Sequence, residues 1–169
     1  MKLTKLYEIQ GGLKAHIDYK EKDKFEKMML ALLVEVGEAV NDWRGFKYWS
    51  QNQESKPTLL EEYVDGFHFV LEAGLDLLEV GLIKELPEEE KTFVGDTLNI
   101  TKKFKAVMRA ALRVDADYID RHYLAKSNYT QLLRQYLGLG AMLGFSEEQI
   151  IAAYLDKNKV NHERQNNGY

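Results

Sequence analysis

The sequence predicts an all-α protein, and three observations lead to this. Apolar residues recur at three- and four-residue spacing over most of the chain, which is the period of a helix with one buried face. No stretch shows the alternation of apolar and polar residues that is typical of a half-buried strand. The two prolines, Pro57 and Pro87, fall between the periodic segments, so they interrupt no helix. We therefore expect a helical bundle.

Length and composition are those of a globular protein. The 169 residues suit a single domain, 1–169, and 45% of them are hydrophobic while 30% are charged. The net charge of −4 and the absence of a basic stripe argue against nucleic acid as a partner. No run approaches the roughly 20 apolar residues that a membrane span needs, and the N-terminus lacks a signal-peptide core. The chain has no cysteine, which fits a cytoplasmic location.

Three helices are predicted in the first half of the chain, at about residues 3–19, 22–44 and 58–80. In the first, the apolar stripe is partial because Gly11 and Gly12 interrupt it. The second has the most regular series, with apolar residues at i, i+3 and i+4 positions from Phe25 to Trp43. The third follows a loop with several aromatic residues and carries its own stripe of large apolar side chains.

Four further helices are predicted in the second half, at about residues 95–113, 116–125, 128–143 and 147–164. The periodic segments KFKAVMRAALRV and YTQLLRQYLGLGAML supply apolar stripes that suit either the intrachain core or a surface between subunits. Gly144 is expected to end one helix, and Ser146 with Gln149 to start the last as a capping box. Thr58 with Glu61 has the same capping-box pattern at the start of the third helix.

Two pairs of carboxylates accompany the apolar stripes of the second and third helices. Glu35 and Glu38 are set into the apolar run LLVEVGEAV, where they share one flank at roughly 80° and 140° from the stripe centre. Glu62 and Asp65 share one side of the next helix. If these two faces meet, four carboxylates form a cluster.

Such a cluster needs a counter-charge, because like charges in a poorly solvated cleft repel one another. Oxygen ligands without cysteine or paired histidine favour Mg²⁺, with Mn²⁺ as the alternative, over zinc. Each acidic pair alone is typical of a solvated helix surface, and the two pairs together favour a metal site. A di-iron bundle would need two acid-x-x-His pairs, and the sequence has one approach to that pattern, Asp65 with His68.

These residues carry a resemblance to a known family. EVGE at 35–38 and EYVD at 62–65, with 23 residues between them, resemble the ExxE and ExxD metal-binding signature of the all-α NTP pyrophosphatase superfamily. Within it, the chain is similar to the dimeric dUTPases of phages, Gram-positive bacteria and kinetoplastids. LYEIQGGLKAHI, FKYWS and KNKVNHERQNNGY resemble further motifs of that family in the same order, so the resemblance covers nearly the whole chain.

The resemblance implies a reaction and a metal site. Glu35, Glu38, Glu62 and Asp65 would hold Mg²⁺ ions that bridge the triphosphate of dUTP. Hydrolysis would give dUMP and pyrophosphate by attack of water on the β-phosphorus. One glutamate of the ExxE pair, Glu38 or Glu35, would accept the proton of the water, and Glu38 is preferred because it lies farther from the apolar stripe.

The resemblance also implies substrate contacts outside the metal site. Gln10 would contact the base, Lys47 a phosphate and Trp49 the nucleotide, although the aromatic residues around Lys47 could equally close the edge of the core. The C-terminal segment would supply the remaining contacts. Asn161 would contact the uracil or sugar, and Lys157 and Arg164 would contact phosphate. Gln165 would also contact the substrate, and Tyr169 would help to close the site. For an unrelated protein the same segment would be read as a polar helix end.

Other functions remain open at this point. A sister enzyme that cleaves dCTP or a modified nucleotide would keep the four acids and differ in the base pocket, where Gln10 and Asn161 favour uracil. The resemblance implies a homodimer, and since some phage members bind a repressor protein, such a partner or a purely binding role stays open.

Asp76 is expected at the surface, and the four histidines are expected to be surface or protein-paired residues: His16, His68, His122 and His162.

Overall fold

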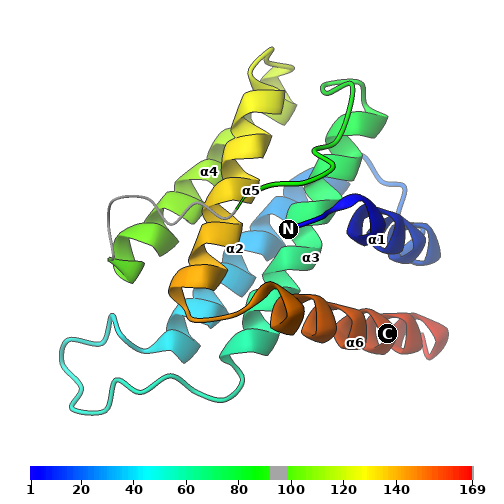
Figure 1. Cartoon of the computed structure of the whole chain (residues 1–169). Helices are drawn as coiled ribbons and strands as arrows, with labels where there is room; N and C mark the ends of the chain where they lie inside the picture. Colours follow the sequence, from blue (N-terminus) through cyan, green and yellow to red (C-terminus); the bar gives the residue numbers. More distant parts are fainter. Residues whose placement is uncertain (92–98, 169) are drawn as a thin grey trace.

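The computed structural model describes residues 1–91 and 99–168 and confirms the all-α fold class (Figure 1). Within these residues there is no strand, only an isolated bridge between Lys2 and Glu89. None of the described helices is long and apolar enough to cross a membrane. The six helices are α1 (Thr4–Ile17), α2 (Lys24–Trp43), α3 (Leu59–Glu79), α4 (Ile100–Asp120), α5 (Ala125–Met142) and α6 (Glu147–Asn166).

Four of the helices form a bundle, and the two terminal helices pack on its side. Contacts join α2 to α3 and α4, and join α5 to α3 and α4, which closes a ring of four helices. Helices α1 and α6 lie across one side of α3 and touch each other there (Figure 1). Helix α3 is therefore the centre of the fold, and it is buried around most of its circumference.

Tyrosines join α3 to α5 inside the core. The Tyr63 hydroxyl donates to the Tyr136 carbonyl at 3.1 Å, and the Tyr136 hydroxyl donates to the Tyr63 carbonyl at 2.7 Å. Glycines on α3 make room for such rings: a Cβ at Gly66 would collide with the Tyr136 hydroxyl, and one at Gly74 with the Tyr129 hydroxyl. Because these contacts are with buried ring atoms, α3 can approach α5 this closely only where it carries glycine.

The prediction of two helices at 95–113 and 116–125 is wrong, since α4 is one helix from Ile100 to Asp120. Its buried stripe continues through Val107, Ala111 and Val114 without a breaking residue. The helix ends after Asp120, where Arg121 takes a left-handed conformation with φ of 52°. Helix α5 then starts three residues before the predicted 128, and predicted helix residues 95–98 lie outside the described part of the chain.

The predicted stop and restart around Gly144 is confirmed. Gly144 follows α5 with φ of +91°, a conformation that glycine adopts without strain. Ser146 and Gln149 form both bonds of a capping box at the start of α6.

The capping box predicted for Thr58 and Glu61 is wrong. Thr58 makes no side-chain cap bond, and its hydroxyl donates instead to Asp42 near the end of α2. Asp42 is buried and also pairs with Lys56, so it ties both ends of the loop 44–58 together. Thr58 has a helical backbone conformation, with φ of −77° and ψ of −6°, in place of the extended conformation of a capping residue, which explains why the local pattern failed.

Candidate active site

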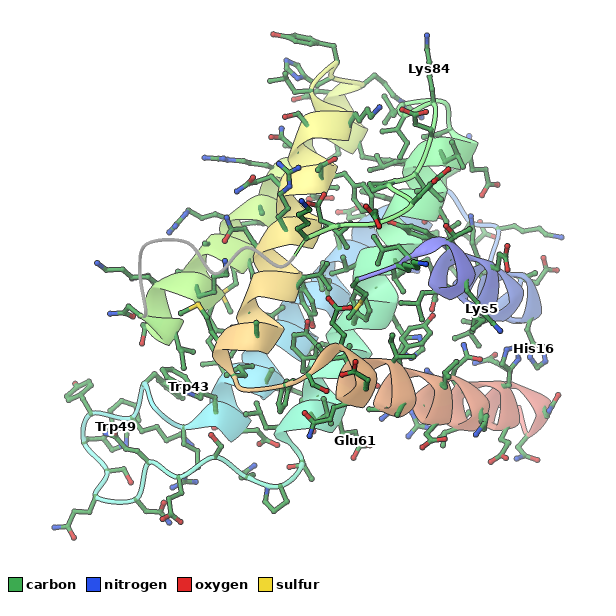
Figure 2. All side chains as sticks on the ribbon, viewed as in Figure 1. Lys5, His16, Trp43, Trp49, Glu61 and Lys84 are labelled. Carbon is green, nitrogen blue, oxygen red and sulfur yellow. The ribbon has the colours of Figure 1, made fainter. Side chains whose placement is uncertain are left out.

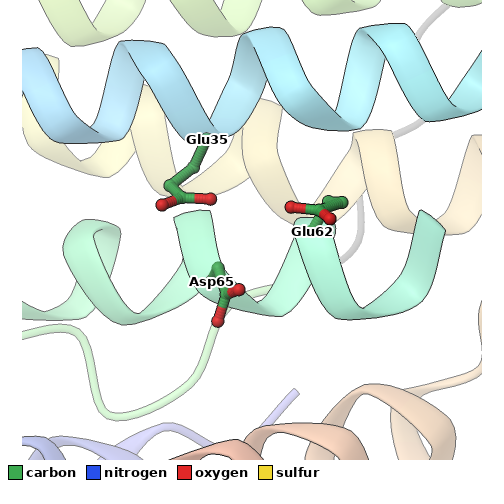
Figure 3. A group of neighbouring side chains, drawn as sticks. All are labelled: Glu35, Glu62 and Asp65. Atoms are coloured by element: carbon green, nitrogen blue, oxygen red, sulfur yellow. The ribbon is translucent and has the colours of Figure 1, made fainter. Parts of the chain in front are cut away.

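The two predicted acidic faces meet where α2 packs against α3. Glu35 extends from α2 towards α3, which carries Glu62 and Asp65 (Figure 3). One carboxylate oxygen from each of these three residues lies within 4.8 Å of the others. The two helices are in direct contact here, since a Cβ added at Gly66, directly after Asp65, would lie at an ordinary contact distance of 3.5 Å from the Glu35 Cβ.

The acids interact strongly because the site is half-buried. Burial, followed by the charges of Asp65, Glu38 and Glu62, raises the pKa of Glu35 to about 7. Burial also raises the pKa of Glu62, to which the charge and a hydrogen bond of Glu38 contribute. Glu38 itself is exposed, so it lies at the outer rim of the group of four acids.

A lysine from α6 already acts as a cation at this site. The Lys157 ammonium lies 2.7 Å from Asp65 and 2.8 Å from Glu61. Burial raises the pKa of Asp65, and the hydrogen bond and charge of Lys157 oppose that rise. The donor set is thus all oxygen, short of positive charge and open to a cation, which fits Mg²⁺ or Mn²⁺.

A cavity of about 280 Å³ lies beside the acids and is lined by α1, α2, α3 and α6. This volume is close to the lower end of ordinary ligand pockets, about 300 Å³. Leu13, Ile17 and Phe69 supply apolar lining. The cavity brings together seven residues predicted from the sequence, namely Gln10, Glu35, Asp65, Lys157, Asn161, Arg164 and Gln165.

Gln10 is fully buried in a set of hydrogen bonds that the sequence did not predict. Its amide nitrogen donates to Glu72 at 2.9 Å, while its oxygen accepts from Tyr154 at 2.8 Å and lies 2.8 Å from Nδ1 of His68. His68 and Glu72 also line the cavity. They lie three and seven residues after Asp65, and that helical spacing on one face was the available signal.

The expectation that Asp76 lies at the surface is wrong. Asp76 is only 6% exposed, and it pairs with Lys14 and Lys24, each at 2.6 Å. Lys24 also lies 2.6 Å from Glu72. The acids on this part of α3 therefore take their counter-charge from lysines of α1 and α2, whereas Glu62 and Asp65 lie close to Glu35 of α2.

Lys47 and Trp49 do not line this cavity. Both lie in the loop between α2 and α3, where the Trp49 side chain is 64% exposed and its ring meets Phe46 edge to face. Figure 2 shows Trp49 at the outer part of this loop, far from His16 at the end of α1. Tyr169 lies outside the described residues, so its predicted role has no structural counterpart here.

Comparison with protein families gives a match over nearly the whole chain. A family model described as dUTPase matches residues 2–169. A comparison with curated proteins finds no match. The matched range includes every helix that contributes to the acidic group and the cavity.

Proposed function

The chain belongs to the dUTPase family, and from this premise we propose that it hydrolyses dUTP to dUMP and pyrophosphate in the cavity beside Glu35, Glu62 and Asp65. The observation that carries this assignment of the site is the meeting of the two acidic pairs from α2 and α3 next to that cavity. Family membership supports dUTP diphosphatase activity, and we propose roles in it for individual residues.

Glu35, Glu38, Glu62 and Asp65 would hold Mg²⁺, with Mn²⁺ as the alternative. When bound, the metal neutralises phosphate charge and lowers the cost of deprotonating water. The raised pKa values of Glu35, Glu62 and Asp65 support this ligand set, because they report mutual repulsion and burial that a cation would relieve.

Glu35 is a better proton acceptor than Glu38, which the sequence favoured. Glu35 lines the cavity in which the substrate would bind, while Glu38 is exposed at the rim. In the proposed step the water oxygen bonds to the β-phosphorus and its proton passes to the Glu35 carboxylate. The bond from the β-phosphorus to the oxygen bridging to the α-phosphate breaks, and dUMP leaves with that oxygen.

The cations and amides of α6 would orient the substrate. Lys157 and Arg164 both line the cavity beside the acids, where they suit the phosphates. Asn161 and Gln165 lie on the same helix and, with Gln10, suit the nucleoside. Contacts from Lys47 and Trp49 would require the loop after α2 to approach the cavity.

The test is pyrophosphate release from dUTP, dCTP, dTTP and UTP, with Mg²⁺ or with EDTA. We expect Mg²⁺-dependent cleavage of dUTP alone and a loss of about 100-fold or more in Glu62→Gln. Glu61→Gln is the matched control, since Glu61 precedes Glu62 and pairs with Lys157 but is outside the acidic group. Cleavage favouring dCTP would remove the uracil assignment and keep the metal site.

Two further measurements test the mechanism. Glu35→Gln should lower kcat more than Glu38→Gln does, and the reverse order would return the base to Glu38. In ¹⁸O-labelled water, attack on the β-phosphorus puts the label into pyrophosphate. Label in dUMP would instead indicate attack on the α-phosphorus.

We also propose that the protein forms a homodimer, as the resemblance to dimeric dUTPases implies. The stripe on α5 is not available as a subunit surface, because Leu132, Leu133 and Leu137 are buried within the chain. Exposed apolar residues on α2 and α4 offer the alternative surface: Leu30, Val34 and Leu112.

A further inference from the structure

Polar side chains of α2 and α3 meet in pairs along the line where the two helices pack. There are three such pairs, in order along that line: Asp42 with Thr58, Glu38 with Glu62, and Glu35 with Asp65. Each step of three or four residues towards the start of α2 is matched by an equal step towards the end of α3. The helices are therefore antiparallel, and one register places all three pairs.

The first of these pairs attracts, whereas the two acidic pairs repel. Asp42 is 4% exposed, and its two carboxylate oxygens accept from the Thr58 hydroxyl and from the Lys56 ammonium. The Asp42 carbonyl also accepts from the Lys56 backbone N–H at 2.9 Å. A buried carboxylate loses free energy when it is deprived of such donors, so this end of the contact between α2 and α3 is fixed.

Thr58 connects this fixed end to the acidic group. Its hydroxyl donates across to α2 and makes no cap bond within α3. Its carbonyl accepts from the backbone N–H of Glu62 at 3.1 Å, in the first turn of α3. Two consecutive hydrogen bonds therefore join the Asp42 side chain to the backbone that carries Glu62.

We propose that Asp42 and Thr58 are positioning residues that set the register of α2 against α3, so that the two acidic pairs meet as one metal-binding group. The inference rests on the proposed function, because it takes the four acids as metal ligands. Apolar packing between the helices is non-directional, and repulsion between the acids favours their separation. The directional bond between Asp42 and Thr58 opposes that separation before a metal binds, as outer partners of metal ligands do.

A direct effect of the Asp42 charge is the alternative explanation. That charge contributes to the raised pKa of Glu62, after burial and the effects of Glu38. A negative charge near the site attracts a cation whatever the register of the helices. The Thr58 hydroxyl separates the two explanations, since its removal leaves every charge in place.

The decisive comparison is between two substitutions of Thr58. Thr58→Val keeps the branched shape and removes the hydroxyl, while Thr58→Ser keeps the hydroxyl. We expect Thr58→Val to weaken Mn²⁺ binding about 10-fold, as loss of an outer partner does, and Thr58→Ser to stay within about 2-fold of the wild type. Asp42→Asn should weaken binding at least as much as Thr58→Val.

Ser55→Ala is the matched control. It removes the bond from the Ser55 hydroxyl to the Trp43 carbonyl, 3.2 Å long, at the same end of the loop 44–58 and does not involve Asp42. Mn²⁺ binding should be unchanged in this variant. Weaker binding in Ser55→Ala equal to that in Thr58→Val would make the effect one of general loosening and overturn the proposal.

Mn²⁺ binding is measured without turnover, from the loss of the electron paramagnetic resonance signal of the free ion. The Mg²⁺ concentration that gives half-maximal pyrophosphate release is the second measurement, and it should rise in Thr58→Val. Thr58 is exposed, and urea midpoints show whether the variants fold. Thr58→Ala, which removes the same hydroxyl, replaces Thr58→Val if the latter does not fold.

The outcomes separate this inference from the proposed function. Equal Mn²⁺ affinities of Thr58→Val and the wild type would overturn the positioning role, and so would a loss in Asp42→Asn alone, which would indicate a charge effect. A wild type that binds Mn²⁺ with the expected differences between variants but does not cleave dUTP would overturn only the proposed function. A wild type that does not bind Mn²⁺ would overturn both.

Discussion

Glu35 illustrates how the surroundings of one carboxyl group change its behaviour. Its pKa is raised to about 7 by burial and by three neighbouring acids, while the unfolded chain would titrate it near the ordinary value of 4.5. Between these values the folded state binds more protons than the unfolded state, so rising pH lowers the free energy of unfolding. Glu62 and Asp65, whose pKa values are also raised, act in the same direction.

We therefore predict that Mg²⁺ stabilises the protein more at pH 8 than at pH 5.5. Deprotonation of these acids costs the metal-free fold roughly 1–2 kcal/mol after allowance for solvent screening, and bound metal recovers it. The measurement is the Tm with and without Mg²⁺ at the two pH values. Glu35→Gln should reduce the pH dependence, and an equal Mg²⁺ effect at both pH values would contradict the assigned ligands.

The sequence predicted some residues of the site and missed others for a physical reason. Glu35, Glu62 and Asp65 were predicted because two acidic pairs lie beside the apolar stripes of consecutive helices and their spacing resembles a known signature. Glu72 and His68 were missed because their importance lies in contacts with α1, far away in the sequence. Helical periodicity gives the face of a residue and does not name its partner.

At the scale of elements, glycine determines how closely α3 approaches α5. Tyr129 sits against Gly74, and its hydroxyl also bonds to the Tyr7 hydroxyl at 2.8 Å, which links α1 to the same contact. A methyl group at Gly74 would displace a fully buried ring, and no flexible atom is there to yield. The contact therefore supports three helices at once.

We predict that Gly74→Ala lowers the free energy of unfolding by about 1–3 kcal/mol, as overpacking in a core does. Gly12→Ala is the control, because Gly12 is also helical and exposed and has nothing within 4 Å of an added Cβ. That variant should gain up to about 1 kcal/mol from helix propensity. Urea unfolding measures both, and equal effects would show that the Tyr129 contact does not limit stability.

The points at which helices begin could be predicted where the capping hydrogen bonds are local in the sequence. The Ser146 cap was found because its partner lies three residues away. The Thr58 cap failed because Thr58 has a helical backbone conformation, and its hydroxyl donates to Asp42, 16 residues earlier. The break predicted inside α4 failed because the buried face of this helix continues across it, through Ala110, Val114 and Asp117.

At the scale of the whole molecule, one apolar surface is left uncovered. Leu30 and Val34 on α2 are 63% and 50% exposed, and Leu112 on α4 is 53% exposed. Leu30 and Leu112 line a groove of about 240 Å³ whose lining also includes Glu26 and Asp115. Asp115 has a buried carboxylate oxygen without a hydrogen-bond partner among the described residues, which a cation of a second copy could supply.

We predict that the double variant Leu30→Glu, Leu112→Glu is monomeric while the wild type is dimeric. Two added charges would face the same charges across a symmetric interface, and their desolvation would be unfavourable. Light scattering after size-exclusion chromatography measures the mass. Val160→Glu, at an exposed position on α6, should stay dimeric, and a dimeric double variant would place the interface elsewhere.

The ion pair between Lys157 and Asp65 has a thermodynamic consequence that involves the whole molecule. If a metal cation binds Asp65 as proposed, it would compete with the Lys157 ammonium, which would then be free to contact the phosphates. Metal and triphosphate would thus be heterotropic ligands, and each should raise the affinity of the other by the same factor. We expect calorimetry to show tighter Mg²⁺ binding in the presence of a non-hydrolysable dUTP analogue. In Lys157→Met, Mg²⁺ alone should bind more tightly, and the coupling between Mg²⁺ and the triphosphate should shrink. Lys157, as an internal counter-ion, would thus link two binding equilibria that are otherwise separate.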